Sequence, residues 1–307
     1  MAVASYLRAG RLSHGGASVT SADARLPISV VVPARNAGDF IEACLTAVQR
    51  NRPAEIIVVD GRSEDDTIEI ARRYTDSVLS DEGGGVAYAR QMGAEAAKQP
   101  YVAFVDVDIE LTDTALEDLL AELRDRELEA IQAQLRSVGG KDYWSRALVS
   151  HHRGGRSKHW FGLVASLFVR EAFLHYGMDS AFSSGEDIEL RYRLEKSGAK
   201  IGLSEKVVVP HRFGSGFNFA LGQWMADGSG LGRVVRKFGW PAAATLLIPA
   251  GGTVLGIGRS LLRQPQFVPY YALYGACNYA GIVQGLFDRK VRRSRSVKQF
   301  EPYRDHS

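Results

Sequence analysis

The 307-residue sequence has few cysteines, little net charge and no apolar run near its start. Its two cysteines, Cys44 and Cys277, are too far apart for a metal knuckle or a disulfide framework, and they fit a reducing compartment. The net charge of only +3 gives no case for nucleic acid as a partner. Residues 1–26 lack the apolar stretch of a secretory signal, so we expect a mobile N-terminal extension and no export.

What is present is the composition of a folded protein, with 45% apolar and 24% charged residues. From Pro27 onward, apolar runs alternate with stretches of helical spacing. Three runs predict buried strands, namely Ile28–Val32 ended by Pro33, Glu55–Asp60 and Tyr101–Val105. Three stretches predict helices, namely residues 38–50, a helix that starts at 63–66 with Ser63 as N-cap, and residues 87–98. This alternation predicts an α/β fold with a mainly parallel sheet, whose strand carboxyl ends share one ligand-binding edge.

The second half of the sequence is less regular. Residues 188–196 predict a short helix closed by Gly198, and residues 207–209 predict a further strand. A basic, glycine-containing loop is expected over residues 151–160. It is either a solvated loop or a contact for a phosphate and a sugar ring, through Arg153, Arg156, Lys158 and Trp160.

Acidic residues follow or precede several of these elements. Asp106 and Asp108 come directly after a predicted strand, where paired carboxylates can hold a divalent cation against a diphosphate. Glu186 and Asp187 precede a predicted helix, so they either stabilise its N-terminus or supply a general base. His211 is either structural or the residue that completes a metal site with Asp108, because imidazole and carboxylate suit ions such as Mn²⁺.

The C-terminal part contains two long runs without charge, the 21 residues 238–258 and the 24 residues 264–287. Each is long enough to cross a bilayer, although prolines and glycines interrupt both. Basic residues flank the runs, which favours cytoplasmic flanks. The alternatives are two spans, a re-entrant or interfacial hairpin, a pair of buried helices and a dimer surface.

Five segments in order resemble the inverting family 2 glycosyltransferases of GT-A fold. They are Val-Val-Val-Pro-Ala-Arg-Asn at 30–36, Ile-Ile-Val-Val-Asp-Gly-Arg-Ser-Glu-Asp-Asp-Thr at 56–67, Gly-Gly-Val-Ala-Tyr-Ala-Arg-Gln-Met-Gly at 84–93, Tyr-Val-Ala-Phe-Val-Asp-Val-Asp at 101–108 and Gly-Glu-Asp-Ile-Glu-Leu at 185–190. The resemblance covers residues 27–215. It departs from the family pattern at Gly61, where a second acidic residue is common.

The resemblance implies transfer of a sugar from a UDP, GDP or dTDP donor to a hydroxyl group, with inversion and with Mg²⁺ or Mn²⁺ as cofactor. It also implies a role for each matching residue. Pro33, Arg35, Asp60, Arg90, Asp106 and Glu186 would bind the nucleotide sugar, Asp108 with Asp106 and His211 would bind the metal, and Asp187 would be the base.

On this interpretation the chain divides into a catalytic domain over residues 27–230, an apolar helical segment over 231–290 and a basic tail over 291–307. The catalytic domain has a nucleotide-binding half, 27–135, and an acceptor half, 136–230. Residues 238–287 would hold the enzyme at the cytoplasmic face of a membrane, where a polyprenyl- or lipid-linked acceptor in cell-envelope glycan synthesis is one alternative and a soluble acceptor the other.

Two other functions compete with this one. A sugar nucleotidyltransferase has a similar α/β core, but residues 33–38 lack the Gly-rich, Arg- or Lys-containing signature that usually follows its first strand. A non-catalytic membrane scaffold would not need Asp106, Asp108 and Asp187, all of which are present.

Overall fold

The computed structural model describes residues 25–153, 161–291 and 302–304. Most of the expected N-terminal extension and of the basic tail therefore lies outside the described residues. The same is true of Arg156, Lys158 and Trp160, whose expected contacts stay predictions.

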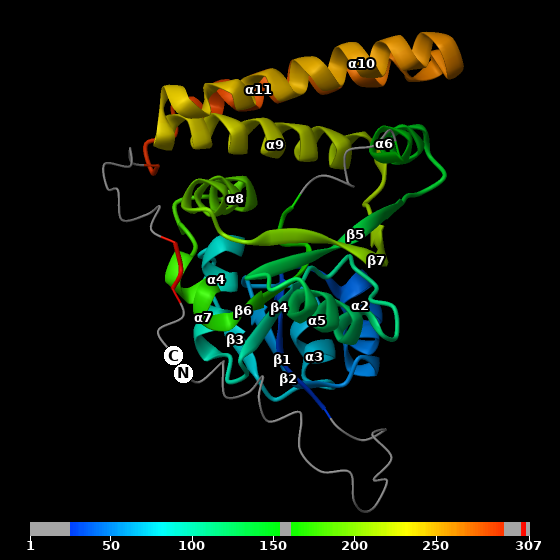
Figure 1. Cartoon of the computed structure of the whole chain (residues 1–307). Coiled ribbons are helices and arrows are strands. Elements are labelled where there is room, and N and C mark those ends of the chain that lie inside the picture. The colour runs from blue at the N-terminus through cyan, green and yellow to red at the C-terminus, as the bar shows by residue number, and fades with distance from the viewer. Residues whose placement is uncertain (1–24, 154–160, 292–301, 305–307) are drawn as a thin grey trace, which may run out of the picture.

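A seven-stranded sheet forms the centre of the larger layer in Figure 1. In sheet order its strands are β3 (Val78–Ser80), β2 (Pro53–Asp60), β1 (Leu26–Ala34), β4 (Tyr101–Val105), β6 (Ala165–Val169), β5 (Ala130–Val138) and β7 (Ile201–Arg212). β6 runs antiparallel to both of its neighbours, and all the other pairs are parallel. The predicted mainly parallel sheet is confirmed, and its strand carboxyl ends gather at one edge as expected.

The first predicted strand continues through Pro33, which the sequence analysis expected to end it. Pro33 pairs in register with Val59 of β2, whereas the pairing of β1 with β4 stops at Val31. On the β4 side, therefore, the missing N–H of Pro33 falls beyond the ladder and costs it no hydrogen bond.

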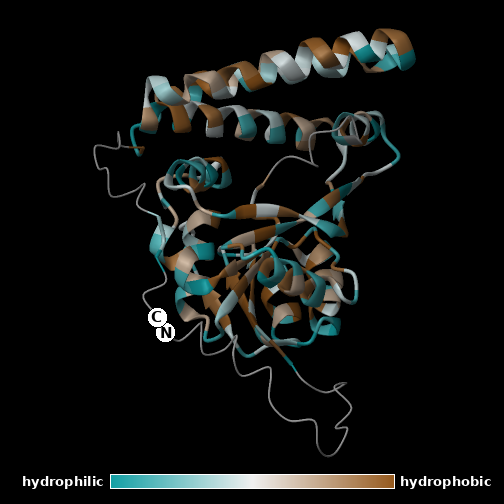
Figure 2. Ribbon diagram, viewed as in Figure 1, coloured by the Kyte–Doolittle hydropathy of each residue, from teal (hydrophilic) through white to brown (hydrophobic). Residues whose placement is uncertain are grey.

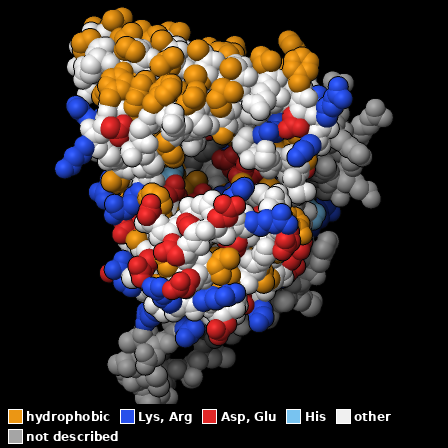
Figure 3. Space-filling view, turned by 180° about the vertical axis from the view of Figure 1, so that it is seen from behind, with side chains coloured by type: hydrophobic (Ala, Val, Ile, Leu, Met, Phe, Trp, Pro, Cys, Tyr) orange, Lys and Arg blue, Asp and Glu red, His pale blue; other side chains and the backbone are white. Residues whose placement is uncertain are grey.

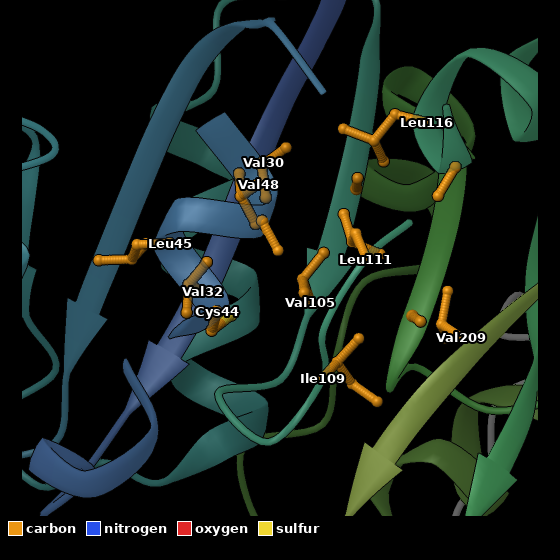
Figure 4. Packing of buried hydrophobic residues seen from close by; sticks show 14 of the residues in the cluster. Val30, Val32, Cys44, Leu45, Val48, Val105, Ile109, Leu111, Leu116 and Val209 are labelled. Carbon is orange, nitrogen blue, oxygen red and sulfur yellow. The ribbon is translucent and has the colours of Figure 1, made fainter. Parts of the chain in front are cut away.

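Helices cover both faces of this sheet. They are α2 (Gly38–Arg50), α3 (Thr67–Ala71), α4 (Val86–Ala96), α5 (Ala115–Asp125), α7 (Arg170–Tyr176) and α8 (Glu186–Ser197). Apolar residues of α2 and α5 meet one face of the strands, and apolar residues of α4, α7 and α8 meet the other. Figure 4 shows the first of these clusters, in which Val32 and Leu45 are fully buried.

The expected helix start at residue 63 is wrong. Helix α3 begins at Thr67, and Ser63 lies in the preceding loop. The Ser63 hydroxyl accepts a hydrogen bond from the Asn36 amide, and its own amide donates to the Asp60 carboxylate. Residues 61–66 therefore connect the loops after β1 and β2, and the helix begins four residues later than expected.

Above the sheet edge lies a layer of helices (Figure 1). Helix α9 (Gly216–Phe238) contacts α8 and α6 (Tyr143–Arg153), and α11 (Val268–Leu286) lies along α9. The connection runs through the 3₁₀ helix Trp240–Leu247, helix α10 (Ile248–Arg263) and the 3₁₀ turn Pro265–Phe267. The expected domain boundary between residues 230 and 231 falls inside the continuous helix α9. The expected loop over 151–160 is wrong for residues 151–153, which end α6.

Helix α10 and part of α11 expose large apolar side chains. Val254, Leu261, Leu262 and Val283 are each more than half exposed, and apolar residues crowd the upper layer in Figures 2 and 3. In the described part of the chain, one helical segment, Trp240–Arg263, is long and apolar enough to cross a membrane. Helix α11 instead buries one side against α9. In this arrangement, α10 and α11 are therefore not two separate membrane-spanning helices.

Candidate active site

Arg90 of α4 stands at the centre of a buried ion-pair network. One guanidinium nitrogen donates to Asp106 Oδ1 at 2.6 Å and the other to Glu186 Oε1 at 2.7 Å. The Arg90 side chain is only 3% exposed. It therefore joins the carboxyl end of β4 to the start of α8, and its bond to Glu186 spans 96 positions of sequence.

Asp108 lies two residues beyond Asp106, next to the end of β7. His211 Nε2 is 3.1 Å from Asp108 Oδ2, and the Arg212 amide donates to the Asp108 carbonyl. A β-bridge between Ile109 and His211 holds the two segments together. Asp108 and His211 are thus in contact, and their shared role as metal ligands stays a prediction.

The same region contains buried polar atoms that the rest of the described chain does not satisfy. Asp108 Oδ1 and Arg90 Nε have no hydrogen-bond partner among the described residues. A carboxylate oxygen left open beside an imidazole suits a Mg²⁺ or Mn²⁺ ion that takes its other ligands from a substrate. No cluster of three or more acidic, His or Cys side chains suited to a metal is found in the described residues, and the binding of a metal by Asp108 with Asp106 and His211 stays a prediction.

The charges at this edge shift one another's protonation. Although burial disfavours a charged guanidinium, the carboxylates of Asp106 and Glu186 raise the pKa of Arg90, which stays protonated. Burial raises the pKa of Asp106, and the Asp108 carboxylate adds to this rise while Arg90 opposes it. At this edge of the sheet, a positive charge therefore lowers the free-energy cost of holding two carboxylates close together. That charge can come from Arg90 or from a bound cation.

Asp187 follows Glu186 in the first turn of α8 and is half buried. Its Oδ1 accepts the Ile188 amide at 2.8 Å, as expected for an acidic residue at a helix N-terminus. Gly185, which caps this helix with φ of 75°, packs directly on Gly230 of α9. A β-carbon at Gly230 would lie 2.7 Å from the Gly185 Cα, so both positions require glycine and fix the α8 start against α9.

The predicted nucleoside residues lie at the ends of β1 and β2. The Asp60 side chain is buried and accepts the Ser63 amide, while Arg35 is exposed at the surface. A β-carbon at Gly61 would lie 3.3 Å from the Arg35 Cβ, which gives a steric reason for the small residue where the family often has an acid. Pro33 lies beside them at the end of β1. Arg90 is enclosed by its two carboxylates, so its expected contact with the nucleoside stays a prediction.

Two residues of this region were missed by the sequence analysis, Asp227 and Arg233 of α9. Arg233 donates to Ser184 Oγ at 2.6 Å and to Asp288 Oδ2 at 2.7 Å, and so it joins the loop before α8 to the end of α11. Asp227 lies one helical turn before Gly230. The helical period of α9 was the available signal, but the sequence alone does not identify α8 as its neighbour.

The arrangement of these residues agrees with a sequence match. The profile of the family described as "Glycosyl transferase family 2" matches residues 29–178. Residues 29–178 form a family 2 glycosyltransferase domain. The match contains most of β1, all of β2 and β4 and the Asp106–Asp108 segment, and it ends before α8.

Two relatives illustrate the extent of the similarity. The "Succinoglycan biosynthesis protein ExoA" of Rhizobium meliloti (strain 1021) is 27% identical over 204 residues, which are 58% of this chain and 60% of that protein. The "Uncharacterized glycosyltransferase YibD" of Escherichia coli (strain K12) is 36% identical over 100 residues, 30% of this chain and 29% of that protein. The chain thus matches between about a third and three fifths of the length of these curated relatives.

Solved structures share the fold at lower identity. The "Mannosyltransferase PcManGT from Pyrobaculum calidifontis in complex with GDP-Man and Mn2+" superposes with a TM-score of 0.61 at 19% identity, covering 87% of this chain and 89% of that one. The S. aureus TarS fragment 1-349 in complex with UDP-GlcNAc gives a TM-score of 0.54 at 16% identity, covering 87% and 93%. The fold of this chain is therefore GT-A, as the resemblance implied.

Proposed function

We propose that this protein is an inverting glycosyltransferase that moves a sugar from a nucleoside diphosphate donor to a hydroxyl acceptor. One observation carries the proposal: Asp106, Asp108 and His211 meet at the carboxyl edge of the sheet, and Arg90 ties that edge to the helix that carries Asp187. The residues that would bind the donor and the residue that would act as the base therefore belong to one connected region. The family match and the donors named for PcManGT and TarS support the same substrate class.

The roles of the side chains follow from their positions. Asp108 and His211 would hold Mg²⁺ or Mn²⁺, which when bound neutralises charge on the departing diphosphate. Asp60, with Pro33 and Arg35 nearby, would line the nucleoside pocket. Arg90 would keep Asp106 and Glu186 in place, because both of its terminal nitrogens are already engaged.

Asp187 would take the proton from the attacking hydroxyl. Its position in the first turn of α8 places the carboxylate at the positive end of the helix dipole, and its partial exposure leaves it accessible to an acceptor. Inversion follows when the hydroxyl attacks the sugar carbon on the side opposite to the diphosphate.

We propose further that the apolar surface of residues 238–287 binds the cytoplasmic face of a membrane. The exposed side chains of Val254, Leu261 and Leu262 would enter the lipid, and the exposed Arg259 and Arg263 of the same helix would meet anionic headgroups. Together with the similarity to ExoA, this surface supports an acceptor in cell-envelope glycan synthesis that is attached to lipid.

The test is a thermal-shift screen of UDP, GDP and dTDP on the full-length protein, with and without Mn²⁺. A ligand that binds the folded state raises the unfolding temperature in proportion to the logarithm of its concentration over its Kd. We expect one nucleotide to give a shift that requires the metal and that EDTA removes. A protein that no nucleoside diphosphate stabilises in the presence of Mn²⁺ would contradict the proposal.

A further inference from the structure

Helix α9 has one face that passes from a packed region into an open one. Gly230 of this face touches Gly185, and Lys237, two turns further on, donates to Glu189 of α8. Gln223 and Asp227 continue the same face toward the N-terminus of α9, because residues three and four apart lie together on a helix. Asp227 therefore stands where α9 extends past the start of α8.

This position brings Asp227 near Asp187. Gly185, the residue that contacts Gly230, is two residues before Asp187, and Asp227 is one turn before Gly230. Although the side chain of Asp227 is exposed, desolvation and then the Asp187 charge raise the pKa of Asp227 to about 7. Figure 3 shows a hollow between the apolar layer and the sheet domain, with acidic side chains in it.

The Asp227 carboxyl group has a neutral hydrogen-bond partner. Gln223 Nε2 donates to Asp227 Oδ1 at 3.1 Å, and no Lys or Arg of the described residues forms an ion pair with it. An accessible carboxyl group with a remaining oxygen can accept a hydrogen bond from a hydroxyl group, and its partly protonated form can also donate one. Two acidic groups on neighbouring helices would in contrast repel a phosphate.

We propose that Asp227 binds the acceptor, holding a second hydroxyl group of the ring whose reactive hydroxyl faces Asp187. This inference rests on the proposed glycosyl transfer and makes its acceptor more specific. The group presented to Asp187 is an uncharged sugar with neighbouring hydroxyls, attached to lipid or free, and the phosphate of a polyprenyl phosphate is not the nucleophile.

The experiment uses the full-length protein in detergent with its preferred nucleotide sugar and Mn²⁺. The acceptor probes are octyl glucoside, octyl galactoside, octyl mannoside and farnesyl phosphate. Asp227→Asn is compared with the wild type and with Asp125→Asn, an exposed acid at the end of α5 that serves as control. Unfolding temperature and donor hydrolysis in water are measured for each variant.

We expect the wild type to use at least one glycoside and not farnesyl phosphate. Asp227→Asn should keep the unfolding temperature and the rate of donor hydrolysis, and should lose about tenfold or more in kcat/KM for the glycoside, mainly through KM. Asp227→Glu should recover part of the loss, and Asp125→Asn should match the wild type.

Three results would overturn the inference. They are unchanged glycoside transfer by Asp227→Asn, faster transfer to farnesyl phosphate than to any glycoside, and a wild type that hydrolyses the donor but uses none of the glycosides. In each of these three results, the protein still acts on the nucleotide sugar. A wild type that neither binds nor hydrolyses a nucleotide sugar would instead contradict the proposed function itself.

Discussion

Replacing Arg90 by methionine tests whether burial gives the central ion-pair network its strength. The Arg90 side chain is 3% exposed, and its two partners, Asp106 and Glu186, are 26% and 11% exposed. Removing one member of a buried charge network costs about 3–5 kcal/mol, because the remaining charges stay buried without compensation. Each kcal/mol lowers the unfolding temperature of a chain of this size by about 2–4 °C, so we expect a fall of about 6–20 °C.

A matched control comes from an exposed pair in the same protein. Arg62 donates to Glu82 at 2.9 Å, with side chains that are 65% and 73% exposed. Bond lengths are thus similar while burial differs. Because exposed pairs contribute at most about 1 kcal/mol, Arg62→Met should move the unfolding temperature by no more than about 4 °C. Thermal unfolding of both variants, followed by circular dichroism, makes the comparison.

The pH dependence of the Arg90→Met variant provides a second measurement. Without the guanidinium, only His211 still opposes the effects of burial and Asp108, so the pKa of Asp106 in the folded variant rises further above its unfolded value. A raised folded pKa stabilises the protein below the unfolded pKa and loses this effect as pH rises. The loss of stability caused by Arg90→Met should therefore become smaller as pH falls from 8 to 5. Equal losses in Arg90→Met and Arg62→Met would refute the reasoning.

Four further changes test other parts of the site. Asp187→Asn should keep the metal-dependent nucleotide shift and lose about 10²–10⁴-fold in turnover, and near-normal turnover would exclude the base role. Asp108→Ala should abolish the Mn²⁺-dependent part of the nucleotide shift, and an unaltered response to EDTA would remove Asp108 from the metal site. Leu262→Glu should weaken co-sedimentation with anionic vesicles without lowering donor hydrolysis, whereas unchanged sedimentation would contradict membrane binding. Gly230→Val should lower the unfolding temperature, because its β-carbon would meet the Gly185 backbone 2.7 Å away, and a stable variant would show that the contact can relax.

The sequence predicts the parallel half of the fold well, for a physical reason. Strands β1, β2 and β4 are continuous apolar runs because they are buried on both faces, and such runs stand out from their polar flanks. Strand β5 reads Ala-Ile-Gln-Ala-Gln-Leu-Arg-Ser-Val and contains Gln132, which is buried because its side chain accepts the Gly162 amide. Burial that depends on a distant partner leaves no apolar run to recognise.

The residues of the site also fall into two groups, those that could be placed from the sequence and those that could not. Asp106 and Asp108 follow β4, and His211 lies near the carboxyl end of β7, where parallel topology predicts that strand ends meet, so their proximity could be predicted from the sequence. The ion pair of Arg90 with Glu186 and the contact of Gly230 with Gly185 could not, because both depend on how α8 and α9 dock on the sheet. Asp227 was missed for the same reason.

The packing of α9 against α11 limits which segments of the protein can be replaced. Gly228 and Gly232 of one helix meet the backbone of the other, as do Gly281 and Gly285 in return. The apolar upper layer is thus joined, through these close glycine contacts, to the helix that also carries Asp227. Replacing the residues after 238 with a different apolar segment would therefore remove the partner of α9 and disturb the position of α9 beside α8.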